Sequence, residues 1–487
     1  MENRILKDLE PQSVFKYFEE LSQIPRGSGN EKAISDYLVN FAKKLNLEVK
    51  QDKALNVIIK KPATAGYEKA EPVIIQGHMD MVCEKNKGTE HNFETDPLQL
   101  RIDGDYVYAT DTTLGADNGI AVAYAMAILA SNDIAHPALE VLVTSEEETG
   151  MGGATALDKN DVVGRTLINI DSEEEGTLLV SCAGGIRTCA TLPICWIDGP
   201  NSNVVDCSIV VSGLRGGHSG MDINKERGNA NKILGRVLMK LLNSVDLYIV
   251  NLNGGAKANA IPREADATIK VYENSLSLIN SKIENLNEIL QNELKSSDPG
   301  VKIELKVLDK TTSKCFSKIS TEKAVSLLCL MPNGVKSMSI DIPGLVQSSV
   351  NLGVVITGKN EIEFDSAVRS SVGSLKDEIV NETVILSELL GARINAHSSY
   401  PEWQYDKNSK IRKVFEETYE KLYGEKPEIA ALHAGLECGL FKEKFGEIDM
   451  ISFGPNLYDV HTPNEHMSIS SVKKNWEYLV EVLRNLK

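Results

Sequence analysis

Residues 73–80 read Val-Ile-Ile-Gln-Gly-His-Met-Asp, a short apolar run that passes directly into a polar segment. An apolar run of this length is typical of a strand buried inside a sheet. In an extended segment residues two apart point the same way, so His78 and Asp80 share one face. A metal-bound imidazole commonly donates its other ring N–H to a carboxylate, and Asp80 fits that position. The stretch therefore predicts a buried strand that ends in a polar site, with an exposed polar loop as the alternative.

Comparable apolar runs recur along the chain and alternate with helical patterns. The first third predicts strands at 56–59, 139–144 and 167–170 and helices at 30–46 and about 117–131. From Tyr400 onward the same pattern returns, with a strand at 449–453 between helices at 408–423 and 471–486. Strands that alternate with helices indicate an α/β fold with a mixed, largely parallel sheet covered by helices.

A long insertion interrupts this α/β pattern. Within 185–397 the chain predicts two α+β units of similar order in tandem, each an antiparallel sheet with helices on one face. The sequences of these two halves do not visibly repeat. We therefore expect one domain formed by residues 1–184 and 398–487, interrupted by an inserted domain at 185–397.

Bulk composition excludes several classes of partner. The net charge of −17 argues against nucleic acid and against an anionic membrane surface, because either partner favours a basic protein. No run approaches the roughly 18 apolar residues of a membrane span, and the N-terminal residues lack an apolar signal-peptide core. Eight cysteines without a CxxC pair are typical of reduced thiols, so we expect a cytoplasmic protein.

Further acidic and imidazole side chains follow the predicted strands. Asp117 opens a helix, Glu148 ends the acidic run 146–148 after one strand, Asp171 follows the next, and His461 follows the strand at 449–453. Taken singly, Asp117 could be a helix cap and Glu148 part of a solvated charge run. Together with His78 they supply two imidazoles and three carboxylates at the edge where open α/β sheets form their sites. This set suits two divalent cations that share one bridging carboxylate, which favours a hydrolase.

The inserted region carries a second polar motif, Gly216-Gly217-His218-Ser219-Gly220. Glycines on both sides of His218 predict an exposed loop rather than a packed core residue. An imidazole presented in this way can stabilise an oxyanion.

These motifs, in this order, resemble a known family. Gly-His-Met-Asp at 77–80, Gly-Ala-Asp-Asn-Gly at 115–119, Glu-Glu-Thr-Gly at 147–150, Asn-Ile-Asp-Ser-Glu at 169–173 and Gly-Gly-His-Ser-Gly at 216–220 are similar to motifs of the co-catalytic zinc peptidases related to glutamate carboxypeptidase and aminoacylase. Residues 24–31 and 433–439 resemble the aminoacyl-histidine dipeptidase group of that family, also called the Xaa-His or cytosol non-specific dipeptidases. The resemblance runs over essentially the whole chain.

The resemblance implies a role for each motif residue. His78 and Asp171 would bind one metal ion, Glu148 and His461 the other, and Asp117 would bridge both. Asp80 would orient His78, and Glu147 would act as general base. His218, in an inserted lid domain, would stabilise the oxyanion. The expected substrate contacts are Asn259, Arg369 and Gly435.

The implied activity is metal-dependent hydrolysis of dipeptides with free termini, of Xaa-His type or of broader specificity, through a water held between the two ions. An N-acyl amino acid deacylase or glutamate-type carboxypeptidase is the enzymatic alternative, and a non-catalytic peptide-binding protein is the alternative of another class. We expect two divalent ions per chain, zinc first and cobalt or manganese as alternatives. A homodimer is expected, with a monomer as the alternative. In the family the histidine that matches His218 often acts on the site of a partner chain, whereas some relatives with a long lid supply it within one chain.

Overall fold

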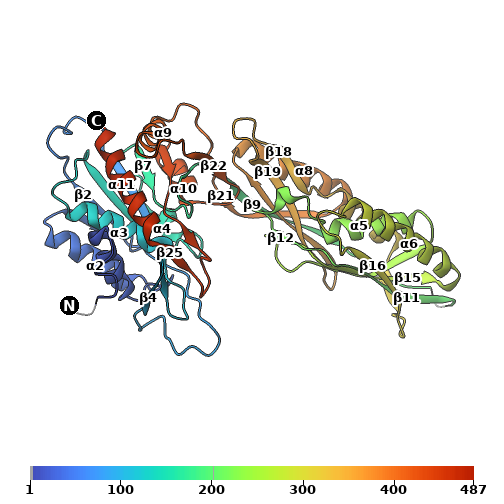
Figure 1. Ribbon diagram of the computed structural model, residues 1–487. Helices are drawn as coiled ribbons and strands as arrows, with labels where there is room; N and C mark the ends of the chain where they lie inside the picture. The colour runs from blue at the N-terminus through green and yellow to red at the C-terminus, as the bar shows by residue number, and fades with distance from the viewer. Residues whose placement is uncertain (1–3, 201) are drawn as a thin grey trace. The chain divides into compact units, whose positions relative to one another are not determined.

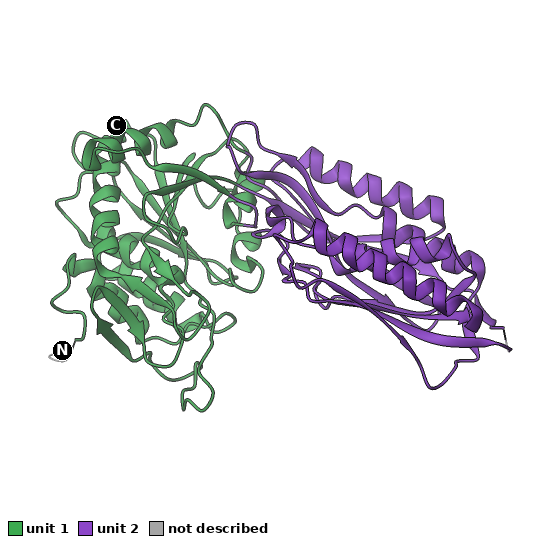
Figure 2. Cartoon of the chain, turned by 45° about the vertical axis from the view of Figure 1, so that its right-hand side comes forward, with its two compact units in different colours: residues 1–181, 405–431, 436–487 green, residues 182–404, 432–435 purple. Residues whose placement is uncertain are grey.

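The computed structural model describes residues 4–200 and 202–487, and its chain divides into two compact units. Unit 1 contains the residues up to Ser181 together with Tyr405–Ala431 and Leu436–Lys487. Unit 2 contains Cys182–Gln404 and Leu432–Gly435. Figure 2 shows the two units in different colours. Among the described residues, no helix is both long enough and apolar enough to cross a membrane.

Unit 1 is built on an eight-stranded mixed sheet with the strand order β1-β2-β6-β3-β7-β23-β8-β22 (Figure 1). Its strands are β1 (Glu48–Gln51), β2 (Val57–Lys61), β3 (Val73–His78), β6 (Leu139–Thr144), β7 (Thr166–Asn169), β8 (Thr177–Cys182), β22 (Glu428–Leu432) and β23 (Asp449–Ser452). The four central strands β6, β3, β7 and β23 are mutually parallel neighbours. Every residue of β3 and of β6 is buried, as expected for strands covered on both faces. The prediction of a largely parallel sheet is confirmed.

Within the described part of the chain, a smaller sheet and seven helices complete unit 1. The strands of the small sheet are β4 (Leu100–Asp103), β5 (Tyr106–Ala109), β24 (Leu457–Tyr458) and β25 (His466–Ser468). The helices are α1 (Gln12–Ser22), α2 (Lys32–Lys44), α3 (Ala116–Ala130), α4 (Gly152–Ala156), α9 (Lys410–Tyr423), α10 (Glu437–Phe445) and α11 (Ile469–Asn485).

Helix α3 is the centre of the unit 1 core. Its sequence after Asn118 is apolar on all sides, and Ile120–Leu129 is buried throughout. A helix that is apolar all round must be enclosed by other elements, and α3 packs against both α1 and β3. Its one large polar group, the Tyr124 hydroxyl, donates a hydrogen bond to the carbonyl of Val472 over 2.8 Å. The core therefore fixes the start of α3 next to the end of β3.

Unit 2 is built on one continuous antiparallel sheet with the main order β16-β11-β15-β13-β19-β20-β9-β21. Its strands are β9 (Gly184–Pro193), β11 (Val204–Ser212), β13 (Leu247–Gly254), β15 (Ala265–Tyr272), β16 (Lys302–Val307), β18 (Gly334–Met338), β19 (Val346–Thr357), β20 (Glu361–Ser370) and β21 (Arg393–Tyr400). Two small pairs are formed by β10 (Trp196–Asp198) with β17 (Lys314–Phe316) and by β12 (Gly217–His218) with β14 (Ala260–Ile261).

Helices cover one face of this sheet (Figure 2). Among the described residues they are α5 (Ala230–Leu242), α6 (Leu276–Glu293), α7 (Lys318–Leu330) and α8 (Gly373–Leu390). The short 3₁₀ helices η1 (Ile223–Lys225) and η2 (Glu273–Ser275) precede α5 and α6. The side chains of Asn229 and Ser317 accept backbone N–H groups at the starts of α5 and α7, which satisfies donors that a helix leaves free.

The sheet of unit 2 consists of two halves with the same arrangement. In one half the chain order is β11-α5-β13-β15-α6-β16, and in the other it is β9-α7-β19-β20-α8-β21. Both are βαββαβ units in which the first strand lies between the third and the fourth. The halves join through the pairs Asn253↔Ile356 and Gly254↔Val355. The tandem order expected from the sequence is wrong in one respect, because the first half is nested between β9 and α7 of the second.

Candidate metal centre

Four of the five candidate ligands follow adjacent parallel strands of unit 1. His78 is the last residue of β3, Glu148 and Asp171 lie in the loops that follow β6 and β7, and His461 lies beyond β23, between β24 and β25. Because parallel strands end at the same edge of the sheet, these loops meet there. The fifth candidate, Asp117, comes from the first turn of α3. Residues that are far apart in the sequence thus reach a single location.

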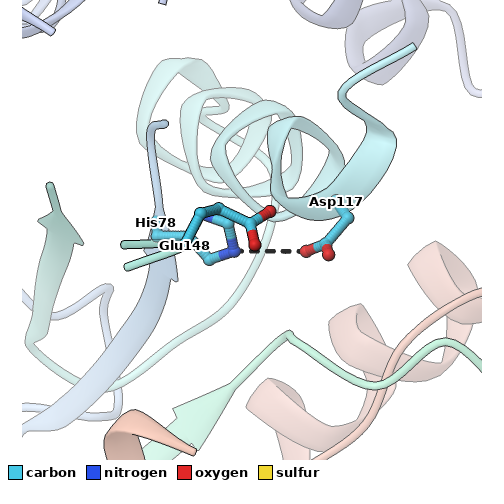
Figure 3. Close-up of side chains that lie close together, drawn as sticks. All are labelled: His78, Asp117 and Glu148. Carbon is cyan, nitrogen blue, oxygen red and sulfur yellow. Dashed lines mark hydrogen bonds and ion pairs between the residues drawn. The ribbon is translucent and has the colours of Figure 1, made fainter. Parts of the chain in front are cut away.

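Asp117 lies between the two imidazoles. Its Oδ1 is 3.1 Å from His78 Nε2 and its Oδ2 is 3.0 Å from His461 Nε2. Figure 3 shows the carboxylate facing His78, with Glu148 beside them. Glu148 Oε1 is 3.1 Å from His461 Nε2, and Asp171 Oδ1 is 3.5 Å from His78 Nε2. The structure therefore brings all five predicted residues together, with Asp117 in the central position.

The electrostatics of this cluster favour positive charge. Burial opposes a charged His78, yet the carboxylates of Asp117, Asp171 and Asp80 raise its pKa well above the ordinary value. Hydrogen bonds with Asp117 and Glu148 raise the pKa of His461 to about 11. Three carboxylates so close together repel one another unless cations or protons lie between them. His78, Asp117 and Glu148 offer ligand atoms within 4.8 Å of one another, so the donor set fits a divalent ion.

Asp80 holds the acidic loop against His78. Its Oδ1 is 3.3 Å from His78 Nδ1 and also accepts the backbone N–H of Glu147 over 3.1 Å. Its Oδ2 accepts the backbone N–H of Glu148 over 3.2 Å and the hydroxyl of Ser28 over 2.7 Å. Asp80 is fully buried. One carboxylate thus fixes both the His78 ring and the backbone of the acidic run 146–148.

Glu147 is the member of the acidic run that points toward the imidazole of His78. Its Oε2 is 4.0 Å from His78 Nε2, and burial raises the pKa of its carboxyl group to about 9. Glu146 is exposed. The structure therefore distinguishes Glu147 from Glu146, which residue pattern alone did not.

Sequence reasoning missed two charged residues that support the start of α3. Glu465 is buried and accepts the backbone N–H groups of residues 114–116 over 2.8–3.0 Å. Arg26 is also buried and donates to the carbonyls of Met79, Asp80 and Gly115. Arg26 lies in the segment 24–31 noted in the sequence, but only the fold shows that it converges with Glu465 near Asp117.

The remaining predicted site residues lie in unit 2. His218 belongs to β12, and its Nδ1 accepts the backbone N–H of Met221 over 3.1 Å. Burial, together with the nearby Arg369, lowers the pKa of His218. Asn259 and Arg369 line one cavity of about 320 Å³, which also includes Tyr400. Arg369 Nη1 donates to the Tyr400 hydroxyl over 2.7 Å, a partner that sequence reasoning missed.

Gly220 shows how close these groups lie within unit 2. A Cβ atom at this position would come within 3.1 Å of His218 Cε1 and 3.3 Å of Arg369 Nε. It would also meet the carbonyl of His433 at 2.4 Å, so only glycine fits. Gly435 lies two residues after His433, in the segment Leu432–Gly435. Unit 2 therefore brings His218 and Arg369 together and places the segment that carries Gly435 beside them.

Comparison with known proteins identifies the class. The family described as Peptidase family M20/M25/M40 matches residues 74–485. The chain belongs to this peptidase family.

Two relatives match over nearly the whole length. The chain is 41% identical to the cytosol non-specific dipeptidase of Escherichia coli (strain K12), over 99% of both chains. The crystal structure of aminoacylhistidine dipeptidase from Vibrio alginolyticus superimposes with a TM-score of 0.95 at 38% identity, covering 100% of this chain and 99% of that one. The aminopeptidase PepT from Bacillus cereus, at 16% identity, a TM-score of 0.58, and 98% and 99% coverage, shares the fold.

Proposed function

We propose that this protein is a dipeptidase that hydrolyses dipeptides with free termini at a site for two divalent cations. The observation that carries the proposal is the position of Asp117, with one carboxylate oxygen facing His78 and the other facing His461. The printed names of two full-length relatives, both dipeptidases, support the substrate class.

The ligand assignment follows the distances. Asp171 lies beside His78 and Glu148 beside His461, so each pair would hold one ion and Asp117 would bridge them. Zinc suits two imidazoles and three carboxylates, and cobalt or manganese accepts the same donors. When bound, two such ions lower the pKa of a water molecule between them and stabilise negative charge on a peptide carbonyl oxygen.

The protein's own groups would move the proton. Glu147, which lies near the cluster without taking a ligand position between the imidazoles, would accept a proton from the attacking water and deliver it to the leaving amine. Asp80 would keep the ring proton of His78 on Nδ1, the nitrogen that faces Asp80. Nε2 would then be unprotonated and able to bind an ion.

We assign unit 1 as the catalytic domain and unit 2 as the lid. His218 would stabilise the developing oxyanion. Its Nδ1 accepts the backbone N–H groups of Gly220 and Met221, so a neutral imidazole carries its proton on Nε2 and can donate it to the oxyanion. Arg369, with Asn259 in the same cavity, would bind the substrate's terminal carboxylate through its planar fork. Gly435 would lie in the loop that binds the substrate.

We place the protein in the cytoplasm, in line with the printed name of the Escherichia coli relative. The eight cysteines form no disulfide among the described residues, which agrees with a reducing compartment. We also propose a homodimer, supported by Ile385 and Leu389, which are 58% and 78% exposed on α8. Its mass in solution tests this point.

Hydrolysis of three compounds tests the function: Ala-His, β-Ala-His and an N-acetyl amino acid. The proposal expects cleavage of the free dipeptides with added divalent metal and none of the acetylated compound. Cleavage of the acetylated compound alone would instead identify a deacylase. A chain that binds no divalent metal would be a peptide-binding protein without catalysis.

A further inference from the structure

Glu437 is a fully buried carboxylate at the start of α10. Its Oε2 accepts the side-chain amide of Gln76 over 2.5 Å and the hydroxyl of Thr144 over 2.9 Å. Its Oε1 is buried too and has no hydrogen-bond partner within residues 4–200 and 202–487. Asn169 donates to Gln76 Oε1 over 2.6 Å, which turns the Gln76 amide group toward Glu437.

This network lies directly behind the candidate metal ligands. Gln76 precedes His78 by two residues on β3, so their side chains share a face, and Asn169 ends β7 two residues before Asp171. Thr144 ends β6, before the loop that carries Glu148. Glu437 therefore contacts two of the three adjacent strands that lead into the site and reaches the third through Gln76.

A purely structural role does not account for a carboxylate at this position. Both donors to Glu437 are neutral, and a glutamine would accept the same two hydrogen bonds without a buried charge. Burial raises the pKa of Glu437 to about 8, while the charge of His78 acts in the opposite direction. Positive charge nearby would favour the ionised form of this buried group.

The proposed cations would supply that charge. Asp117, Glu148 and Asp171 bring three negative charges to the four positive charges of two dications, and Asp80 lies against His78 as a further carboxylate. We propose that Glu437 is a positioning residue of the cation site, a buried carboxylate whose charge the cations stabilise and that holds the ends of β3, β6 and β7 in register. The inference rests on the proposed function and names a residue that does not touch the ions.

Cation affinity tests the inference without relying on activity. Metal-free wild type, E437Q and E443Q would be titrated with Mn²⁺ and with Zn²⁺ in competition with a chelator, and their melting temperatures compared. Glu443 is exposed on the same helix, so E443Q is the matched control. We expect Kd to rise at least tenfold in E437Q and less than twofold in E443Q. Metal-free E437Q should melt no lower than wild type, because burial raises the pKa of Glu437 to about 8 and the neutral form therefore predominates at pH 7 without metal.

A second variant separates charge from hydrogen bonding. T144V removes one donor to Glu437 but keeps the carboxylate, so its Kd should change less than threefold. An E437Q that binds cations like wild type, that loses no more affinity than T144V, or that does not fold would overturn the inference. If wild type itself binds no divalent cation, the proposed function fails instead.

Discussion

The backbone N–H of Glu147 donates a hydrogen bond to Asp80 Oδ1 over 3.1 Å. Asp80 is the same residue that lies against the Nδ1 side of His78. The proposed general base and one proposed ligand are therefore positioned by one buried side chain, and neither can shift without disturbing the other. Changing Glu147 should affect proton transfer, and changing Asp80 should affect metal binding, so variants of the two residues separate these effects.

Glu147→Gln should lower kcat by about 10²–10⁴, because it removes the proposed proton acceptor while keeping the size of the side chain. Metal content should stay at the wild-type level, since Glu147 takes no ligand position in our assignment. Steady-state kinetics and elemental analysis of the same preparation measure both quantities. Glu146→Gln, at the exposed neighbour, is the control and should retain activity. Loss of metal from Glu147→Gln would make it a ligand rather than the base.

Asp80→Ala should weaken metal binding by roughly 10–100-fold, the usual effect of losing a residue that orients a ligand. It leaves three backbone and side-chain donors without their acceptor, so the acidic loop should also become more mobile. Ser28→Ala removes only one of those donors and should change affinity little. Isothermal titration of the metal-free proteins measures the difference, and equal affinities in wild type and Asp80→Ala would contradict the assigned role.

Arg369→Lys should raise KM for dipeptides by roughly 10–100-fold, since a charge-assisted hydrogen bond contributes on the order of 1.5–3 kcal/mol. Tyr400→Phe should raise KM less, because it removes only the hydroxyl that accepts from Arg369. A dipeptide amide, which lacks the terminal carboxylate, should be cleaved equally poorly by wild type and Arg369→Lys. A penalty of the same size on the amide would show that Arg369 does not bind the carboxylate.

His433 should make the stability of the protein sensitive to mild acid. Burial, together with Arg369 and His218, lowers the pKa of His433 to about 3 from an ordinary value of 6.5. Below pH 6.5 the unfolded chain takes up a proton that the folded chain does not, so stability falls with pH. This group should contribute a loss of about 2 kcal/mol between pH 6.5 and pH 5.

His433→Gln removes this titration, so urea unfolding at pH 7 and pH 5 should show a smaller acid loss in the variant than in wild type. His397→Gln, at an exposed position, serves as the control and should follow the wild-type curve. An acid loss of equal size in wild type and His433→Gln would show that His433 does not cause it.

Much of unit 1 could be predicted because its signals are local. The apolar run before His78 is buried on both faces of a parallel sheet, so it reads as a strand without knowledge of its neighbours. Because sites in open α/β sheets form at the carboxyl ends of the strands, Glu148 and Asp171, which follow neighbouring strands, are expected beside His78. Convergence of His78, Glu148 and Asp171 follows from those two features.

The parts that could not be predicted depend on pairing between distant segments. Glu465 accepts the backbone N–H of Ala116 at the start of α3, which is 349 positions earlier in the sequence. Nothing near Glu465 in the sequence indicates this partner. Strand β9 belongs to the second half of unit 2 although the whole first half separates it from α7. Local patterns show that a strand exists there, but the choice among strand partners depends on packing of the complete sheet.

The number of metal ions bound per chain shows whether Asp117 bridges two cations. Elemental analysis of the purified protein, after equilibration with Zn²⁺ and removal of loosely bound ions, should give two ions per wild-type chain. Asp117→Ala should give none or close to none, because Asp117 lies between both imidazoles. A wild-type chain that holds no tightly bound ion, or an Asp117→Ala chain that still holds two, would contradict the account.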